Sequence, residues 1–220
     1  TTKGRPTIRA AVCGTLLALL VSARIPAAPP AECSIRLIDV TESSGITFRH
    51  NHGGSDRGYI VEGMASGLAL FDYDGDGLID IYFLSGAALK GTVVDAPLRN
   101  ALLRNNGDWT FTDVTMAAGV GDLGYGLGVT VGDYDNDGDP DLYLSNFGPN
   151  VLYRNNGDGT FSDVTRQAGV ARGDKVGAGT CFLDMEGDGD LDLYAANYVD
   201  FNYDNQVIRT IGPHQFYPGP

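Results

Sequence analysis

Three short stretches of the chain concentrate carboxylates at a regular spacing. They run Asp72–Asp80, Asp133–Asp141 and Asp184–Asp192, with acids at positions 1, 3, 5 and 9 and glycine at position 6. Ca²⁺ takes about six to eight oxygen ligands, and alternate side chains of a tight loop converge on one point. The glycine permits the sharp reversal that brings them together. The spacing therefore predicts a calcium site in each stretch, about three ions in all.

The predicted ligands are the side chains at positions 1, 3, 5 and 9 and the main-chain carbonyl at position 7. Four carboxylates held this closely without a cation would repel one another strongly, although acidic turns that hold no ion remain an alternative. Mg²⁺ suits the pattern less, because it prefers strict octahedral geometry and retained water. The predicted site residues are Asp72, Asp74, Asp76, Leu78 and Asp80; Asp133, Asp135, Asp137, Asp139 and Asp141; and Asp184, Glu186, Asp188, Asp190 and Asp192.

The spacing resembles the first half of an EF-hand loop, but the rest of the EF-hand pattern is missing. An EF-hand needs a bidentate glutamate at position 12. Phe83, Leu144 and Ala195 occupy that position here. The flanking segments are short and apolar, without a long helical period, so we expect strands on both sides of each loop.

The charge of the chain excludes some classes of partner. It has 28 acidic and 15 basic residues, for a formal net charge of −13. Residues 1–30 hold four of the basic residues and no acid, so the remainder, with 11 basic and 28 acidic residues, carries −17. The three loops supply 14 of the 28 acids. A surface this acidic argues against nucleic acid or an anionic membrane as a partner.

The chain contains internal repeats. The segment Asn100–Thr115 recurs as Asn150–Thr165 at an offset of 50 residues, and the acidic loops follow one another at offsets of 61 and 51 residues. A fixed period of this length is typical of a repeat architecture. The 31 glycines indicate many turns, and the 43% hydrophobic content is enough for a buried core.

Each repeat unit is predicted to contain four strands. Short alternating or apolar runs bounded by Gly, Asn and Asp mark them. The Ala117–Gly119 stretch and its copy are expected to be short connecting turns, and Tyr198–Pro220 is expected to be a loop-like tail. The predicted strands are Gly67–Phe71, Ile81–Leu84, Ala101–Arg104 and Thr110–Val114; Leu127–Val131, Leu142–Ser145, Val151–Arg154 and Thr160–Val164; and Thr180–Leu183 and Leu191–Ala195.

Four antiparallel strands per repeat indicate an all-β fold of the β-propeller type. About two and a half blades are present within residues 35–220, near 60–120, 121–170 and 171–220. Ile35–Thr41 resembles a lone fourth strand, which in a closed ring would complete the last blade. Because propellers close with about four or more blades, we interpret the chain as the N-terminal part of a longer protein. A small open β-array with exposed edges is the alternative.

Residues 1–31 are predicted to be a signal peptide and leader. A basic start precedes an apolar run from Ala10 to Ala23, which suits a signal sequence better than a membrane span. An uncleaved anchor, or a lipid on Cys33, are alternatives. The mature chain is therefore expected to have no membrane span and to be secreted, periplasmic or on the cell surface. Cys181 lies in a strand pattern and is expected to be small and buried.

The strand–loop–strand unit looks like the FG-GAP/VCBS repeat of integrin α-subunit propellers. Tyr153–Val170, Asp39–His50 and Ala196–Phe201 resemble more closely the secreted ASPIC/UnbV, cartilage acidic protein-like branch. The resemblance covers about residues 35–205. It implies a calcium-stabilised, seven-bladed, exported propeller that serves as an extracellular scaffold for binding or adhesion.

Two functional classes follow from these observations. The first is a non-enzymatic module that binds an extracellular protein or glycan, with calcium in a structural role. The second is the propeller portion of a secreted hydrolase whose catalytic part is not in this sequence. The pair His50 and His52 is a candidate metal or catalytic cluster, but we favour a polar loop as the explanation. No serine nucleophile elbow or phosphate-binding glycine loop occurs, so we predict no catalytic residue.

Overall fold

The computed structural model describes residues 36–54, 58–64, 66–171, 173, 175–204, 209–212 and 214–216. The chain divides into two compact units, Thr1–Ile38 and Asp39–Pro220. Everything described below belongs to the second unit. The predicted leader and Cys33 lie outside the described residues, so they stay predictions.

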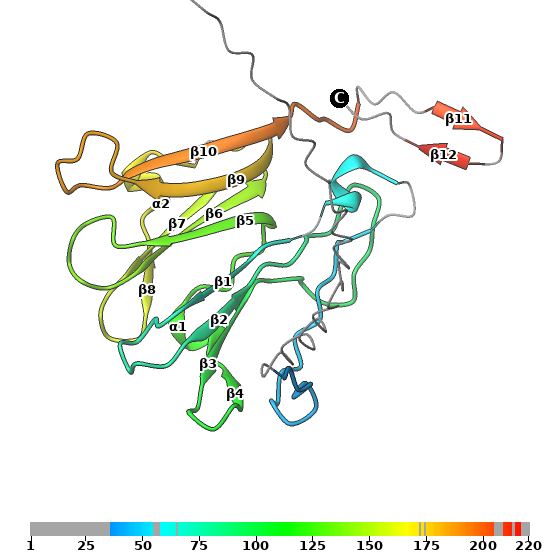
Figure 1. The fold of residues 1–220 in the computed structure, drawn as a ribbon. Coiled ribbons are helices and arrows are strands. Elements are labelled where there is room, and N and C mark those ends of the chain that lie inside the picture. Colours follow the sequence, from blue (N-terminus) through cyan, green and yellow to red (C-terminus); the bar gives the residue numbers. More distant parts are fainter. Residues whose placement is uncertain are drawn as a thin grey trace, which may run out of the picture. The chain divides into compact units, whose positions relative to one another are not determined.

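The first sheet is a four-stranded antiparallel meander, here called blade one (Figure 1). Its strands are β1 (Leu68–Phe71), β2 (Asp80–Phe83), β3 (Ala101–Asn105) and β4 (Phe111–Asp113), hydrogen-bonded in chain order. Because side chains alternate along a strand, Leu68 and Leu70 share one face, called the leading face. Ala69 and Phe71 lie on the opposite, trailing face.

The second sheet has six strands and contains blade two and a further hairpin. Blade two consists of β5 (Tyr125–Gly132), β6 (Asp141–Phe147), β7 (Val151–Asn155) and β8 (Phe161–Asp163), and the hairpin of β9 (Val176–Leu183) and β10 (Asp192–Val199). The hairpin, called blade three, joins β6 through one residue pair, Phe147 with Val176. Nearly all regular structure is antiparallel β, which agrees with the predicted partial propeller.

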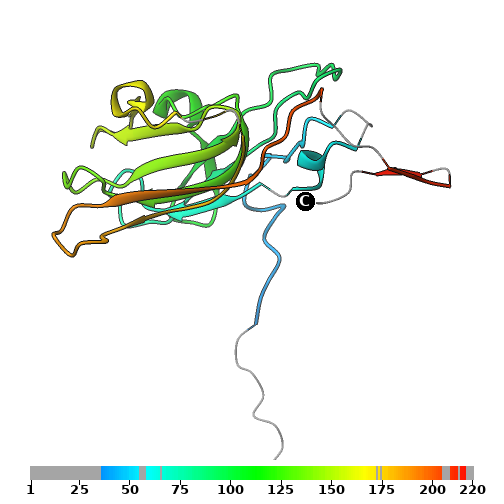
Figure 2. The ribbon, with the colours of Figure 1, turned by 90° about the horizontal axis from the view of Figure 1, so that it is seen from above.

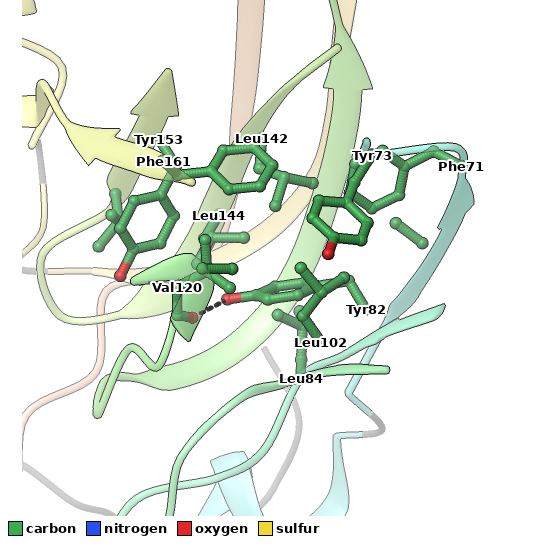
Figure 3. Packing of buried hydrophobic residues seen from close by; sticks show 13 residues of the cluster. Phe71, Tyr73, Tyr82, Leu84, Leu102, Val120, Leu142, Leu144, Tyr153 and Phe161 are labelled. Carbon is green, nitrogen blue, oxygen red and sulfur yellow. Dashed lines mark hydrogen bonds between the residues drawn. The ribbon is translucent and has the colours of Figure 1, made fainter. Parts of the chain in front are cut away.

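Blade one and blade two pack face to face. The trailing face of blade one and the leading face of blade two meet in one buried cluster, which Figure 3 shows from close by. The hydroxyl of Tyr82 donates a hydrogen bond of 2.7 Å to the carbonyl of Val120 inside it. The side chains drawn and labelled there are Phe71, Tyr73, Tyr82, Leu84, Leu102, Val120, Leu142, Leu144, Tyr153 and Phe161.

Glycines let neighbouring blades approach closely. A Cβ atom on Gly128 would lie 2.6 Å from the carbonyl oxygen of Ala178 in blade three. A Cβ atom on Gly132 would lie 2.8 Å from the ring of Phe182. The main chains of blades one and two are also linked, since Gly126 N donates to Ser85 O at 2.9 Å. Several of these glycines lie inside β5 and β9, because both strands begin earlier than predicted.

One-turn helices follow the outermost strands of blades one and two. They are α1 (Thr115–Ala118) and α2 (Thr165–Ala168), and Figure 2 shows both at the same edge of the sheets. Asp113 Oδ1 accepts hydrogen bonds from the amide and hydroxyl of Thr115, at 2.9 and 2.6 Å. Gly119 closes α1 in the left-handed region, with φ of 77°. These helices are the short turns expected from the repeated sequence.

Two expectations about the ends of the domain were wrong. In this unit the end of the predicted first strand, residues 39–41, forms no strand, because Val40 O accepts a hydrogen bond from Ser44 N at 2.9 Å in a turn. The tail is not all loop: β10 continues to Val199, and β11 (Arg209–Ile211) pairs with β12 (His214–Phe216). A short 3₁₀ helix, η1 (Ile60–Gly63), was not predicted.

Cys181 is exposed, which contradicts the prediction of a buried cysteine. It lies on the trailing face of β9, opposite Tyr194 of β10. The corresponding residue of blade one is Ala69, which is buried because blade two covers it. The described residues place no further sheet over Cys181, so the same strand position is exposed here.

Candidate metal centres

The three acidic loops occupy equivalent places in the three blades. Asp72–Asp80 connects β1 to β2, Asp133–Asp141 connects β5 to β6, and Asp184–Asp192 connects β9 to β10. They leave the same end of the sheets in both views (Figures 1 and 2). The prediction of strand–loop–strand units is confirmed. We call them loops one, two and three.

The first acid of loop one shapes the turn through backbone hydrogen bonds. Asp72 accepts the amide of Asp76 at 3.1 Å and the amide of Gly77 at 2.8 Å. Asp76 in turn accepts the amide of Leu78 at 2.9 Å. In a tight turn, hydrogen bonds that nearby backbone amides donate to carboxylates take the place of the hydrogen bonds between strands. They fix the positions of two predicted ligands.

Loops two and three repeat the same pattern. Asp133 accepts the amides of Asp137 at 3.0 Å and Gly138 at 2.9 Å. In loop three, Asp184 accepts the amides of Asp188 at 3.1 Å and Gly189 at 3.0 Å. The repeated sequence therefore produces the same local geometry three times.

The ninth residue of loops one and two is a buried carboxylate that ties the loop to the sheet. Both Asp80 and Asp141 have no exposed surface. Asp80 accepts the amides of Tyr73 at 3.1 Å and Asn105 at 2.7 Å. Asp141 accepts those of Tyr134 at 3.0 Å and Asn155 at 2.8 Å. Each carboxylate thus joins the start of its loop to the third strand of its blade.

Loops one and two gather acids in a way that suits a cation. One oxygen each from Asp72, Asp74 and Asp76 lies within 4.8 Å of the others, and the same holds for Asp133, Asp135 and Asp141. Ligand oxygens about 2.3–2.6 Å from a Ca²⁺ ion lie at most about 5 Å apart. The donor atoms are all hard oxygens, as Ca²⁺ requires. The residues present therefore fit the predicted ion.

The other predicted ligands belong to the same loops but not to these two groups of three acids. Asp80 joins the sheet as described, and Leu78 contributes only its main chain to the prediction. Asp137 accepts the amide of Asp139 at 3.0 Å. Loop three forms no group of three acids in the described structure. There Glu186, one methylene longer, stands where loop one has Asp74, and Asp184 also accepts the amide of Gly187.

Burial and mutual repulsion act on the acids of loops one and two. Burial raises the pKa of Asp141 to about 6, while backbone hydrogen bonds oppose the change. Burial also raises the pKa of Asp80 and, with the nearby Asp137, that of Asp135. In loop three the amide of Gly189 lowers the pKa of Asp184. A cation in loops one and two would offset this cost of ionising buried acids.

Two asparagines near the sites have roles that the sequence analysis did not assign. Asn155, fully buried, donates through Nδ2 to Tyr73 O at 2.8 Å and to Pro140 O at 3.2 Å, so it links loop one to loop two. Asn136 donates to Gly189 O at 3.3 Å and links loop two to loop three. The repeated Arg-Asn-Asn-Gly-Asp stretch was the available signal for Asn155, but its Asn and Gly residues were used only to mark the ends of predicted strands.

The histidine pair shows no site-like arrangement. Nδ1 of His50 lies 3.4 Å from the carbonyl oxygen of Leu84. Both His50 and His52 are exposed. Neither belongs to a group of three potential ligands in the described part of the chain. Any catalytic role of the pair stays untested.

Comparison with known families agrees with the repeat analysis. The family described as FG-GAP-like repeat matches the chain over residues 72–144 and again over residues 133–195. Each match begins at the first acid of a loop, and together they cover more than half of the 220 residues. No curated protein matches the chain. No helix in the described segments is long and apolar enough to cross a membrane.

Proposed function

Because the chain belongs to the family of FG-GAP-like repeats, we propose that it is an exported calcium-binding propeller module of the ASPIC/UnbV branch. Its calcium ions hold the blade hairpins in shape. The module presents its surface to an extracellular protein or glycan and performs no catalysis itself.

The observation that carries this proposal is the hydrogen-bond network common to the three loops. Backbone amides hold the first, fifth and ninth acids, and the oxygens of loops one and two converge within 4.8 Å. In loops one and two, three carboxylates of a single turn would hold the ion. Backbone hydrogen bonds of the same turn fix the first of these acids, which favours an ion that supports the turn over one that binds substrate.

The location of the loops supports the same role. Each loop lies between paired strands, and its ninth acid is bonded to the third strand in blades one and two. An ion bound there would join the first, second and third strands of a blade. Removing it would leave the buried Asp80 and Asp141, whose pKa values are raised, beside the other uncompensated acids of their own loops. We therefore expect calcium to stabilise the fold.

Thermal unfolding with and without calcium tests the proposal. A site occupied at one hundred times its Kd stabilises the fold by about 2.7 kcal/mol. In a chain of this size, 1 kcal/mol shifts Tm by about 2–4 °C. We expect excess EDTA to lower Tm by about 5–10 °C for each site that empties. An unchanged midpoint would contradict a structural role for calcium.

Calcium titration of a loop variant tests the site itself. Asp133→Ala removes a predicted ligand of loop two, and Asp95→Ala removes one exposed acid outside the loops. Calorimetric titration should find one binding site fewer in Asp133→Ala and the full number in Asp95→Ala. Stoichiometry separates ligand loss from the stability that Asp133 provides through its backbone hydrogen bonds. Equal stoichiometry in both variants would show that loop two is not a site.

A further inference from the structure

Asn155 connects the acidic loops of blades one and two through both its main chain and its side chain. Its backbone amide donates to Asp141 Oδ1 at 2.8 Å, and its own Oδ1 accepts the amide of Gly157 at 3.1 Å. Its Nδ2 donates to Pro140 O at 3.2 Å and to Tyr73 O at 2.8 Å. The residue has no exposed surface. Buried and fully bonded, Asn155 has one defined place between loop two and loop one.

On the side of loop two, Asn155 is bonded to the end of a predicted calcium site. Asp141 forms, with Asp133 and Asp135, the group whose oxygens lie within 4.8 Å of one another. Pro140, whose carbonyl accepts from the side chain of Asn155, directly precedes Asp141. An ion that fixes Asp141 would therefore also fix the main chain to which Asn155 is bonded.

On the side of loop one, Asn155 is bonded to the residue between two other predicted ligands. Tyr73 stands between Asp72 and Asp74, and both of these acids belong to the group of three in loop one. The carbonyl that accepts from Asn155 is part of the peptide unit that leads from Tyr73 into Asp74. The position of Asp74 relative to Asp72 therefore depends on this bond.

Three parts of Tyr73 are held in place. Its ring stacks on Phe161 of blade two with ring centres 6.3 Å apart, inside the buried cluster of Figure 3. Its amide donates to Asp80 Oδ2 at 3.1 Å, and its carbonyl accepts from Asn155. Only 5% of the residue is exposed. A displacement of Asn155 therefore acts directly on the main chain of loop one.

We propose, on the basis of the calcium role stated above, that Asn155 couples calcium binding at loop two to calcium binding at loop one. An ion at one loop orders Asn155, so the other loop loses less conformational freedom when its own ion binds. Because coupling between two binding sites is reciprocal, each ion raises the affinity of the other loop by the same factor. Couplings of this kind typically change an affinity by about fivefold or more.

A different side chain connects loop two to loop three. Asn136, at position 4 of loop two, donates through Nδ2 to Gly189 O at 3.3 Å and to Asp190 Oδ1 at 3.1 Å. Its φ is 59°, and Gly75 and Gly187 have φ of 72° and 74° at the same position of loops one and three. Asn136→Gly therefore removes the link to loop three while it keeps the backbone of the turn and the link to loop one.

Two-dimensional NMR of the isotope-labelled chain, with calcium added stepwise, measures each loop separately. Gly77 and Gly138 donate their amides to the first acids of loops one and two, so their resonances report binding there. Asp135→Asn removes a charged ligand of loop two and keeps the size of the side chain. We expect it to move the calcium midpoint of Gly77 about fivefold or more upward. Asp74→Asn, the equivalent change in loop one, should move the midpoint of Gly138 by a similar factor.

A double-mutant cycle tests whether Asn155 carries the coupling. In chains that also carry Asn155→Ala, Asp135→Asn should leave the midpoint of Gly77 unchanged. The effect of Asp135→Asn should persist in chains with Asn105→Ala, which removes the same side chain from the equivalent position of blade one. It should persist in chains with Asn136→Gly as well. A full-sized effect in the Asn155→Ala chain would overturn the assignment to this residue.

The negative results have different meanings. If both glycine resonances respond to calcium but Asp135→Asn leaves the midpoint of Gly77 in place, the loops bind independently. The coupling is then refuted, while the proposed calcium role stands. If neither resonance responds to calcium, the calcium role fails and the coupling fails with it. Should Asn155→Ala not fold, the coupling still requires reciprocal shifts in Asp135→Asn and Asp74→Asn, and a shift in only one of them overturns it.

Discussion

Replacing Asn155 by alanine should destabilise the protein far more than the same change at Asn105. The two residues occupy equivalent positions of β7 and β3, and both hold their loops through a backbone amide that the change leaves in place. The side chain of Asn155 also donates to Tyr73 O at 2.8 Å across the blade interface. Asn105 makes no such contact between blades within the described structure.

The expected difference in stability follows from the main-chain carbonyl of Tyr73, which loses its hydrogen-bond donor in Asn155→Ala. Tyr73 is 5% exposed, and a buried acceptor that loses its partner costs about 1–3 kcal/mol. Both variants lose the weaker bond within their own loop, to Pro140 O or to Ile79 O, so that loss cancels. The difference between the variants should be about 2 kcal/mol, or about 4–8 °C in Tm for a chain of this size.

Chemical denaturation of the two variants measures this difference. Urea unfolding in saturating calcium gives the free energy of unfolding of each variant. Asn105→Ala is the matched control, because it removes the same side chain from a partly exposed site. If both variants lost equal stability, the bond from Asn155 to loop one would not hold the blades together.

Three further predictions concern the backbone and the acids. Trp109 has φ of 67°, a backbone conformation that residues other than glycine adopt at a cost. Trp109→Gly should therefore raise the free energy of unfolding by about 1 kcal/mol, and with it Tm. Trp109→Ala should leave Tm unchanged. Gly128→Ala should lower stability by about 1–3 kcal/mol because its Cβ would meet Ala178 O at 2.6 Å; Gly179→Ala, with nothing within 4 Å, should not. Without calcium, stability should fall as pH rises from about 4 to 6. The raised pKa of Asp141, about 6 against an ordinary 3.8, makes the folded chain bind more protons than the unfolded chain in that window. Added calcium should remove this fall in pH-dependent melts; a calcium-free Tm that rises over the window would refute it.

Much of the fold follows from local patterns. Ala101–Asn105 and Val151–Asn155 begin at the predicted residues and end one residue later than predicted. Gly, Asn and Asp residues flank these short apolar runs and mark both ends of each strand, because turn residues and strand residues differ in backbone preference. The glycine-rich starts of β5 and β9 were missed. Glycine weakens a strand locally, and the close approach of Ala178 to Gly128 and of Ser145 to Gly177 explains its use there.

The acidic loops show the same division between local and distant information. Their turn geometry depends on hydrogen bonds that span at most five residues, such as Gly77 N to Asp72, so the sequence was enough to predict it. The links between loops were not predictable. Asn155 reaches Tyr73 across 82 residues, and Asn136 reaches Gly189 across 53, and nothing in the local pattern specifies such partners.

By itself the sequence determined the repeat, the strand–loop–strand unit and the position of the acidic loops. All of these depend on residue type and short-range spacing. The tertiary structure alone decided which equivalent positions are covered. Tyr82 and Tyr194 have the same place in their strands, yet one is fully buried and the other is 62% exposed. Burial depends on what packs against a face, and that neighbour comes from a different part of the chain.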